Sequence, residues 1–319
     1  MKELVVISGK GGTGKTSIVA SFAALAEKAV LADCDVDAAD LHLVLDPKIV
    51  ERGKFSGGSR ARIQSGHCTA CGKCEEICRF DAIYFDGPGN GKVAKTYRID
   101  PIGCEGCGVC AWFCEENAIK FAPVVNGEWF ISDTRCGPMV HAALGVAEEN
   151  SGKLVSLVRT EAKRVAENRK LDLILIDGSP GIGCPVIASI AGADLVLVVT
   201  EPTLSGLHDL QRVADLTKHF GIVTLVCINK WDLNPDIASQ IETQAFQHDL
   251  KVSGRVRYDH AVTEAQIKRL SVVEYASDGI VSEIKELWSN VRARLNAEKG
   301  QAGNGDFPTR DSRRFGKGD

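Results

Sequence analysis

The chain has 319 residues, a length typical of two domains or of one large domain with an addition. Its 38 Lys and Arg residues against 42 Asp and Glu residues give a net charge of −4, which argues against a protein built around polyanion binding, and we expect no nucleic-acid partner. A hydrophobic content of 44% excludes a disordered chain, and no apolar run is long enough to span a bilayer. Because residues 1–30 lack a secretory signal pattern, we expect a cytoplasmic protein.

The first elements along the chain predict an α/β fold. Leu4–Ser8 is a short apolar strand candidate, followed by a glycine-rich loop, a helix over Lys15–Lys28 and a second strand over Ala29–Ala32. We interpret four later apolar runs as strands: Leu154–Val158, Leu171–Ile176, Leu195–Thr200 and Ile222–Ile228. Helical patterns cover Leu204–His219 and Pro235–His248. Continuous apolar strands are typical of a sheet covered on both faces, so we predict a doubly wound, mainly parallel sheet.

The amino-acid composition changes between these two parts of the sequence. Residues 55–130 hold eight cysteines and many glycines, and we interpret them as a small domain inserted into the α/β domain of residues 1–54 and 131–296. An amphipathic helix over 280–295 is predicted to pack onto the sheet rather than onto a membrane or a partner. Residues 297–319 are polar and predicted to be disordered, and Arg313 and Arg314 within them support at most a weak membrane contact.

The loop after the first strand matches a phosphate-binding motif. Its residues are Gly9, Lys10, Gly11, Gly12, Thr13, Gly14, Lys15 and Thr16, and Ser17 follows them. The spacing fits G-x-x-x-x-G-K-[ST], placed between a strand and a helix as this motif requires. Backbone N–H groups and the helix N-terminus would hold phosphate oxygens. Lys15 would reach the terminal phosphates, and the Thr16 hydroxyl would bind Mg²⁺.

Lys10 adds a second lysine early in this loop. The sequence KGGTGKT resembles the deviant Walker A motif of the MinD/ParA/Mrp and nitrogenase iron protein group. The resemblance implies that Lys10 reaches the phosphates of a partner subunit, in the manner of an arginine finger. It therefore implies an ATP-dependent homodimer, or a pseudo-symmetric heterodimer with a related ATPase.

Acidic residues follow two of the predicted strands. The resemblance implies that Asp35 orients or activates the attacking water, with Asp33 supporting it. The alternative is an ordinary solvated acidic loop. Asp177 ends the run LILID and resembles a Walker B aspartate that holds Mg²⁺ and leads into a switch loop at Gly178–Gly181.

The sequence Asn229-Lys230-Trp231-Asp232 ends the strand candidate at Ile228. In the resembled family an Asn at this place contacts the base, which assigns Asn229 to nucleotide binding. N-K-x-D also resembles the GTPase motif in which the aspartate, here Asp232, selects guanine. We favour ATP over GTP because the rest of the motif set resembles the MinD group.

Eight of the 12 cysteines form two windows with one spacing, C-x-x-C-x-x-C-x-x-x-C. This is the spacing of bacterial ferredoxins that carry two [4Fe–4S] clusters, where the fourth cysteine of each run binds the other cluster. The predicted ligands of the first cluster are Cys68, Cys71, Cys74 and Cys114, and those of the second are Cys104, Cys107, Cys110 and Cys78. The matching flanks Asp81–Ile83 and Asn117–Ile119 support a ferredoxin-like pseudo-twofold repeat.

The two windows differ from the usual ferredoxin sequence at one position, and they also allow zinc as an alternative metal. Ferredoxins usually have proline after the fourth cysteine, where this chain has Arg79 and Glu115. That change alters the charge near each cluster without altering the number of ligands. Two zinc sites are the rival, although zinc sites do not usually repeat a third closely spaced cysteine.

The four remaining cysteines are scattered. Cys184 follows the predicted switch loop, and the related nitrogenase iron protein holds a dimer-bridging cluster with a similarly placed cysteine. Cys136 is a candidate second ligand for such a third cluster, and ordinary packing is the alternative for both. Cys34 and Cys227 are predicted to lie in the core. Arg135 and the polar loop at residues 149–153 are either part of a nucleotide or dimer surface or ordinary turns.

Three functions remain open at this level. The first is an ATPase that couples nucleotide-dependent dimerisation and switching to electron transfer through two clusters, with an unidentified redox partner. The second is an iron–sulfur assembly or carrier ATPase, as Mrp-like relatives are thought to be. The third is a positioning ATPase of the MinD or ParA kind in which the clusters sense redox state.

Overall fold

The computed structural model describes residues 1–145 and 151–297, and within them nine strands form one large sheet. The strand order is β13-β12-β11-β1-β10-β2-β9-β8-β3. The strands from β13 to β9 are parallel, whereas β8 and β3 are antiparallel to their neighbours. The large-sheet strands are β1 (Lys2–Ser8), β2 (Ala29–Asp33), β3 (Lys48–Phe55), β8 (Gly127–Thr134), β9 (Gly137–Leu144), β10 (Leu173–Pro180), β11 (Leu195–Thr200), β12 (Thr224–Asn229) and β13 (Lys251–Val256).

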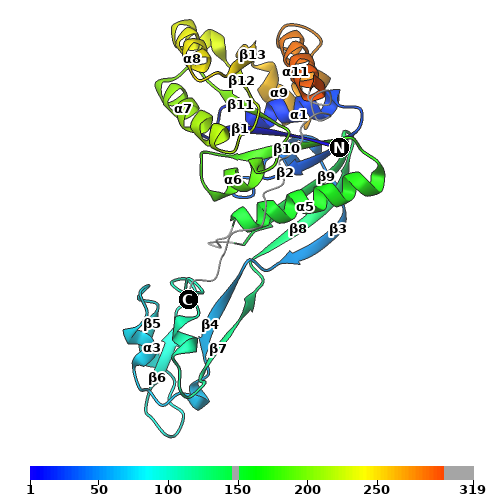
Figure 1. Ribbon diagram of the computed structural model, residues 1–319. Helices are drawn as coiled ribbons and strands as arrows, with labels where there is room; N and C mark the ends of the chain where they lie inside the picture. Colours follow the sequence, from blue (N-terminus) through cyan, green and yellow to red (C-terminus); the bar gives the residue numbers. More distant parts are fainter. Residues whose placement is uncertain (146–150, 298–319) are drawn as a thin grey trace, which may run out of the picture.

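Helices cover both faces of this sheet (Figure 1). They are α1 (Lys15–Leu25), α2 (Leu41–Leu45), α5 (Ser151–Arg169), α6 (Cys184–Ile190), α7 (Leu204–His219), α8 (Pro235–Gln247), α9 (Ala261–Ile267), α10 (Val272–Tyr275) and α11 (Ile280–Ala297), with the short 3-10 turn η2 (Trp231–Leu233). Leu4 and Val6 of β1 belong to a core with α1 and α11, whereas Val5 and Ile7 belong to a core with α5, α6, α7 and α8. Alternate strand residues point to opposite faces, and both faces need apolar side chains, which explains the continuous apolar runs.

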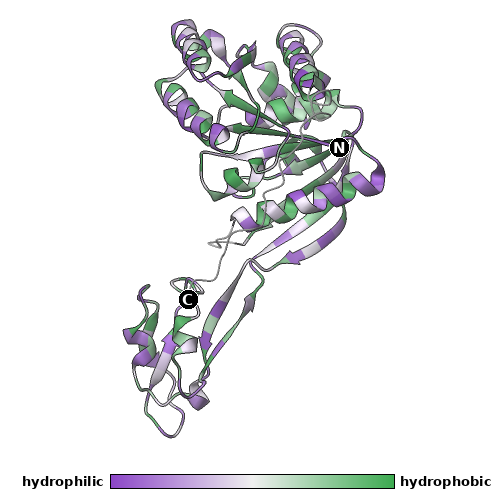
Figure 2. Cartoon of the chain, in the orientation of Figure 1, coloured by the Kyte–Doolittle hydropathy of each residue, from purple (hydrophilic) through white to green (hydrophobic). Residues whose placement is uncertain are grey.

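Hydropathy follows the same arrangement. Figure 2 shows hydrophobic strands at the centre and helices whose outer faces are hydrophilic. On α11, Ile284, Leu287 and Trp288 are buried in the core, so the expected packing of this helix onto the domain is confirmed. Within the described part of the chain, no helix is both long enough and apolar enough to cross a membrane.

The cysteine-rich segment forms a separate body below the sheet (Figure 1). It contains the antiparallel pairs β4 (Gly58–Ile63) with β7 (Ile119–Val124) and β5 (Ile83–Gly87) with β6 (Thr96–Ile99). Its short helical segments are η1 (Ser65–His67), α3 (Lys73–Glu76) and α4 (Val109–Trp112). A small core of Ala61, Ile83, Ile99 and Ile119 packs among the cysteines. We call residues 58–124 the cysteine module.

The backbone of the module repeats itself. Ala70 and Gly106 have φ values of 60° and 63°, and Asp81 and Asn117 both have 50°. These residues occupy the same positions relative to the two cysteine windows. Left-handed backbone at matched positions is the structural form of the repeat that the sequence indicates.

The module leaves the large sheet at one particular edge. Strand β9 runs parallel to β2, and its last residue Leu144 pairs with Gly127, where β8 begins. Phe55, the last residue of β3, pairs with the same Gly127. The chain therefore enters and leaves the module at the carboxyl edge of the parallel strands, which is also the edge where the loop after β1 lies.

The structure differs from the expected elements at one strand and at one domain boundary. The predicted strand Leu154–Val158 is wrong, because these residues lie within helix α5. Its buried residues Leu154, Val155, Val158, Ala162, Val165 and Ala166 recur with helical spacing, and a window of five residues is too short to show that period. The expected insert boundary at residue 130 falls inside β8 of the large sheet. The predicted disordered tail, with Arg313 and Arg314, lies outside the described residues apart from Ala297, which ends α11.

Candidate nucleotide and cysteine sites

The loop between β1 and α1 adopts a conformation that glycine makes possible. Gly12 and Gly14 have φ values of 79° and 88°, which residues with a Cβ rarely adopt. A Cβ on Gly14 would lie 2.3 Å from Nδ2 of Asn229. The loop thus passes too close to β12 for any side chain at this position, and it delivers Lys15 to the first turn of α1.

Lys15 lies among carboxylates of β10 and of the segment that follows β2. Strand β10 continues to Pro180, so Asp177 does not end the strand as the sequence indicated. Its Nζ donates to Oδ1 of Asp177 at 2.5 Å and lies 3.3 Å from Oδ2 of Asp35. The Thr16 hydroxyl donates to the other Asp177 oxygen at 2.8 Å. Lys15 is 6% exposed and Asp177 is fully buried. The structure therefore brings together the phosphate loop, the segment after β2 and strand β10, although Lys15 and Asp177 lie 162 residues apart in sequence.

Burial and charge set the protonation of this group. Burial raises the pKa of Asp33 well above its usual value, and the neighbouring charge of Asp177 raises it further. Burial also raises the pKa of Asp35, although Lys15 opposes this. Burial alone would lower the pKa of Lys15, but the charges of Asp177 and Asp35 outweigh it and the pKa is raised. Lys15 is thus held as a cation beside Asp33 and Asp35, whose carboxyl groups resist ionisation.

Two observations test whether these residues fit a magnesium-bound nucleotide. Oγ1 of Thr13 is buried within the loop and has no hydrogen-bond partner, and a buried unsatisfied hydroxyl is costly unless a ligand completes it. Thr16 and Asp177 supply the oxygen donors that Mg²⁺ prefers. The donor set fits a phosphate group with its metal ion.

Lys10 turns back onto its own chain. Its Nζ donates to Oγ of Ser205 at 2.8 Å and to Oγ1 of Thr203 at 3.2 Å, and it forms an ion pair of 2.8 Å with Glu201. Glu201 also binds Lys230, whose Nζ donates to the carbonyl of Gly12 at 2.8 Å. Glu201 was not among the predicted site residues, and Lys230 was named only as part of the Asn229–Asp232 motif. Their one signal is their position at the carboxyl ends of β11 and β12.

The three remaining predicted nucleotide contacts are engaged within the chain. Nδ2 of Asn229 donates to the carbonyl of Thr13 at 2.7 Å, so Asn229 holds the phosphate loop. Oδ1 of Asp232 accepts the backbone N–H of Tyr258 at 2.7 Å. Oγ of Ser17 accepts from Gln266 of α9 at 3.0 Å.

All 12 cysteines are free thiols, and eight of them line two hollows in the module. One hollow is lined by Cys68, Cys71, Cys74 and Cys114. The other is lined by Cys78, Cys104, Cys107 and Cys110. Each hollow thus takes three cysteines from one window and the fourth from the other window.

Backbone N–H groups also reach two of these sulfurs. The N–H of Ala70 lies 3.4 Å from Sγ of Cys68, and the N–H of Ala118 lies 3.3 Å from Sγ of Cys114. Across residues 1–145 and 151–297, no three His, Cys, Asp or Glu side chains are placed to hold a single metal ion.

The structure does not bring Cys136 and Cys184 together within one chain. Cys136 lies in the turn between β8 and β9, and the adjacent Gly137 contacts Ala29 at the start of β2. Cys184 begins α6 after the carboxyl end of β10 and is exposed. The two residues are therefore at opposite edges of the parallel strands. Arg135 binds Glu274 and the carbonyl of Val44, so its contacts are internal.

The predicted polar loop at residues 149–153 is described only from Ser151, where α5 begins. Lys153, in the first turn of this helix, donates to the carbonyl of Gly57 at 2.7 Å. Gly57 lies between β3 and β4, where the chain enters the cysteine module. Lys153 was expected in a loop, and its contact with Gly57 was not predicted because 96 residues separate the two groups.

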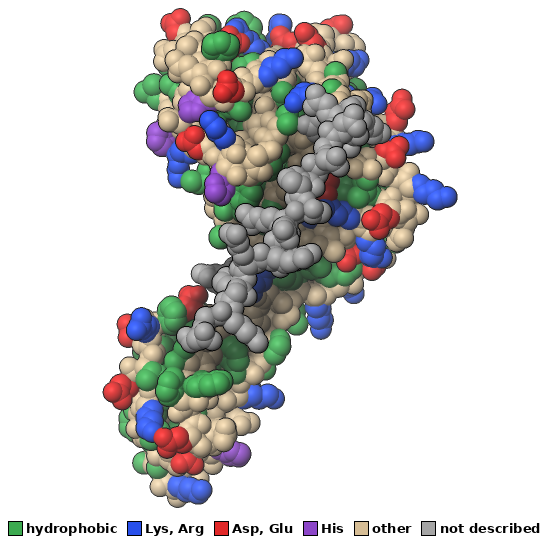
Figure 3. Space-filling view, viewed as in Figure 1, with side chains coloured by type: hydrophobic (Ala, Val, Ile, Leu, Met, Phe, Trp, Pro, Cys, Tyr) green, Lys and Arg blue, Asp and Glu red, His purple; other side chains and the backbone are tan. Residues whose placement is uncertain are grey.

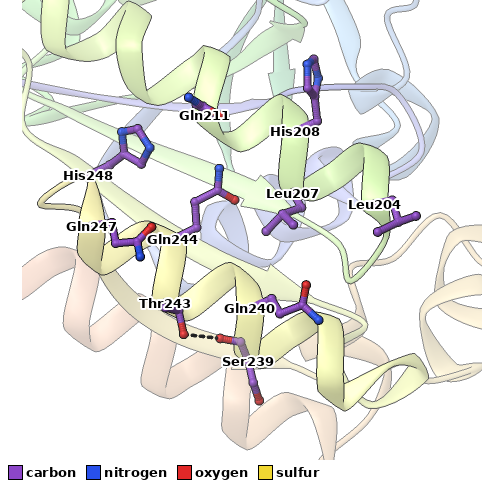
Figure 4. Close-up of a pocket in the computed structure, with 10 residues that line it drawn as sticks. All are labelled: Leu204, Leu207, His208, Gln211, Ser239, Gln240, Thr243, Gln244, Gln247 and His248. Carbon is purple, nitrogen blue, oxygen red and sulfur yellow. Dashed lines mark hydrogen bonds between the residues drawn. The ribbon is translucent and has the colours of Figure 1, made fainter.

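A polar hollow of about 630 Å³ lies between α7 and α8, away from these sites. Figure 4 shows Gln244 extending from α8 toward α7, and Thr243 bonded to Ser239 one turn earlier. Oε1 of Gln244 is buried without a hydrogen-bond partner. The lining contains no cysteine and no residue of the phosphate loop.

The fold and the first site together define a class. A parallel sheet with a glycine loop after β1, a lysine in the first turn of α1 and an aspartate at the end of a neighbouring strand is a P-loop nucleotide-binding protein. Residues 4–272 match the model of the CobQ/CobB/MinD/ParA nucleotide binding domain, so the chain belongs to this family. It is a P-loop ATPase of the MinD/ParA type.

Relatives extend over most of the chain. The protein MJ0578 of Methanocaldococcus jannaschii is 33% identical over 295 residues, covering 91% of this chain and 96% of its own length. A second protein of that organism, MJ0579, is 24% identical over 283 residues, covering 86% and 94%.

Solved structures show the same fold. The cell division ATPase MinD of Pyrococcus furiosus has a TM-score of 0.52 at 18% identity, covering 92% of this chain and 98% of its own. MinD in the MinC:MinD complex of Aquifex aeolicus has a TM-score of 0.55 at 16% identity, covering 92% and 96%. At these identities the likeness extends to the fold alone.

Proposed function

We propose that the protein is an ATP-hydrolysing iron–sulfur protein that couples nucleotide-dependent switching and dimerisation to electron transfer through two [4Fe–4S] clusters. The observation that carries this proposal is the mixed origin of the two cysteine sets, three from one window and one from the other. This exchange is the ligand pattern of two-cluster ferredoxins. Four thiolates around a hollow suit a polynuclear cluster, whereas one zinc ion needs all its sulfurs within about 2.3 Å of a single point.

The proposed ligands of the first cluster are Cys68, Cys71, Cys74 and Cys114, and those of the second are Cys104, Cys107, Cys110 and Cys78. When bound, such a cluster accepts or releases one electron at a time. The backbone N–H groups of Ala70 and Ala118 would donate to ligand sulfurs, which is a recognised influence on cluster potential. No disulfide joins any of the 12 cysteines, which fits the reducing, cytoplasmic location of the proposal.

For ATP, the chain supplies a cation, a hydroxyl and three carboxyl groups. Lys15 would exchange its contact with Asp177 for the terminal phosphates, and Thr16 and Asp177 would hold Mg²⁺. Bound Mg²⁺ neutralises charge on the phosphate oxygens. Asp35 is placed beside Lys15, and its raised pKa suits a group that orients or deprotonates water. The bond from Asp232 to Tyr258 supports a structural role for Asp232 and so supports ATP over GTP.

Lys10 supports a switch between two arrangements. In this structure it binds Ser205, Thr203 and Glu201 of its own chain, and its side chain is 33% exposed. Dimerisation would move it to the phosphates of the partner subunit, where it would stabilise transition-state charge. The partner is a second copy or a related ATPase, and the presence of two relatives in M. jannaschii supports the second option.

A continuous set of contacts supports coupling between the two sites. Strand β10 carries Asp177 and leads through Gly181–Gly183 to Cys184. Gly152 of α5 packs so closely here that a Cβ added to it would lie 3.3 Å from the Cβ of Cys184. The residue after Gly152, Lys153, holds the carbonyl of Gly57 at the entry to the module. A phosphate-dependent shift of the loop after β10 would therefore reach the module through the start of α5.

The test measures iron and potential on the full chain. Anaerobic reconstitution should give about eight irons per chain with absorbance near 400 nm, whereas zinc in place of iron would refute the clusters. About ten irons would instead indicate a third cluster shared between two chains. ATP should shift the cluster midpoint potential, measured by redox titration, and Lys153→Met should abolish that shift while keeping ATP hydrolysis. The matched control is Lys163→Met, on the same helix but paired with Glu3 at 2.6 Å. An unchanged nucleotide effect in Lys153→Met would disprove the route.

The exposure of Cys71 and Cys107 favours a second candidate, a cluster carrier. In that case the clusters are cargo and should pass to an apo-acceptor protein within a single incubation, which electron-carrying clusters should not do. A positioning ATPase with redox-sensing clusters also fits the family, which includes the cell division ATPase MinD. Nucleotide-dependent binding to vesicles or DNA would favour it.

A further inference from the structure

The two halves of the cysteine module differ on one surface. Helices α3 and α4 occupy equivalent positions, each after a left-handed glycine, Gly72 with φ 84° and Gly108 with φ 76°. Helix α3 has the sequence Lys-Cys-Glu-Glu, whereas α4 has Val-Cys-Ala-Trp and is followed by Phe113. Both helices present one cysteine to a hollow. A helix at this position can therefore place its cysteine in the hollow without the apolar residues that α4 carries.

These apolar side chains are exposed. Trp112 is 86% exposed and Phe113 57%, and Val109 and Phe121 are each 42% exposed. With Cys107 they line a shallow hollow, and we call these five residues the α4 patch. Figure 3 shows hydrophobic side chains gathered on this part of the molecule. A contiguous exposed apolar patch marks a contact surface more often than an isolated exposed residue does.

Three exposed carboxylates lie close to the patch in sequence: Glu105 precedes Cys107 by two residues, and Glu115 and Glu116 follow Phe113 by two and three. Glu115 is paired with Lys73 of α3, so the net negative charge beside the patch comes from Glu105 and Glu116. Lys120 precedes Phe121 in β7, but consecutive strand residues point to opposite faces. An acidic rim around an apolar centre favours a protein with basic residues around its own apolar contact, and it disfavours an anionic membrane surface.

We propose that the α4 patch is the docking surface for a one-electron redox protein whose contact face has an apolar centre and a basic rim. This inference rests on the proposed function, because it needs the second cysteine set to hold a cluster. Cys107 belongs to that set and is exposed within the patch, so a docked partner lies directly against a proposed ligand. One electron passes from the reduced protein to the oxidised acceptor, and no bond forms or breaks.

The test uses the full reconstituted chain with ferricytochrome c as the probe, because that protein has a basic rim around an exposed haem edge. Binding is measured with both proteins oxidised, so that no electron moves, by titration calorimetry at low salt. Trp112→Ser should raise Kd at least about tenfold and lower the rate of cytochrome reduction by a similar factor. Glu76→Ser is the matched control, because Glu76 occupies on α3 the position of Trp112 on α4. It should change neither quantity more than about twofold.

Iron content and the rate with ferricyanide, a small oxidant that needs no docking surface, should be the same in both variants and wild type. An unchanged Kd in Trp112→Ser, or no binding by wild type, overturns the proposal. So does a change in self-association caused by Trp112→Ser, which would assign the patch to a second copy of the chain. If deletion of residues 298–319 made ferricytochrome c bind more tightly, the α4 patch would be assigned to the tail instead. If the wild type bound vesicles and Trp112→Ser did not, the patch would be assigned to lipid. Wild type without iron refutes the proposed function itself, which iron analysis separates from a docking failure.

Discussion

Replacing Lys15 by alanine should destabilise the nucleotide-free protein as well as abolish nucleotide binding. Lys15 is the cation that contacts both Asp177 and Asp35, and its side chain and that of Asp177 are 6% and 1% exposed. Removing one partner of a buried ion pair leaves an uncompensated charge and costs about 3–5 kcal/mol. We expect the free energy of unfolding of Lys15→Ala to fall by that amount near pH 8.

The loss should depend on pH in a defined direction. Asp33 has a raised pKa in the folded protein, so it binds a proton more readily there than in the unfolded chain. Its contribution to stability is present below about pH 4, the unfolded value, and is lost as pH rises through the folded pKa. Lys15 lowers the pKa of Asp33 and Asp35, so its removal raises both further. The deficit of Lys15→Ala should therefore be smaller at about pH 5 than at pH 8, as a carboxylate takes up a proton.

Urea unfolding followed by far-ultraviolet circular dichroism measures both effects. Lys10→Ala is the matched control, since Lys10 lies in the same loop but its side chain is 33% exposed, and it should cost no more than about 1 kcal/mol. The reasoning fails if Lys15→Ala costs less than about 1 kcal/mol or if its deficit is the same at both pH values.

Three further outcomes are expected. Lys10→Ala should bind ATP as wild type does but lose dimerisation by sedimentation and lose about 10³-fold in phosphate release, and retained hydrolysis would refute the role in trans. Gly14→Ala, with φ +88° and a Cβ 2.3 Å from Asn229, should lower the free energy of unfolding by about 1–3 kcal/mol, whereas Gly11→Ala, whose Cβ would meet nothing within 4 Å, should lower it less. The double mutant Cys68→Ser/Cys114→Ser should retain four of eight irons, because both residues are proposed ligands of the same cluster. The double mutant Cys104→Ser/Cys114→Ser should retain none, because each residue belongs to a different cluster. Four irons in the second pair would mean that each window binds its own cluster.

The phosphate loop and the cysteine windows were predictable because the spacing of nearby residues defines each of them. The phosphate loop and the cysteine windows are contiguous, and their backbone turns are set by residues a few positions apart, such as Gly12, Gly14 and the repeated Asp81 and Asn117. Long strands and helices were also predictable, because Leu204–His219 and Leu195–Thr200 have the bounds that their patterns indicate. Helix α5 was partly missed because its first apolar cluster, read over five residues, has no visible period.

Local sequence patterns specify the class of fold, the phosphate-binding lysine and the two cysteine windows, including the exchange of the fourth cysteine between them. Only the folded chain brings Lys10 to Glu201 and Lys153 to the carbonyl of Gly57. It also separated Cys136 from Cys184 and placed the module at the same sheet edge as the phosphate loop. Contacts between groups so far apart in sequence depend on strand order and register, because no local pattern in the sequence specifies either.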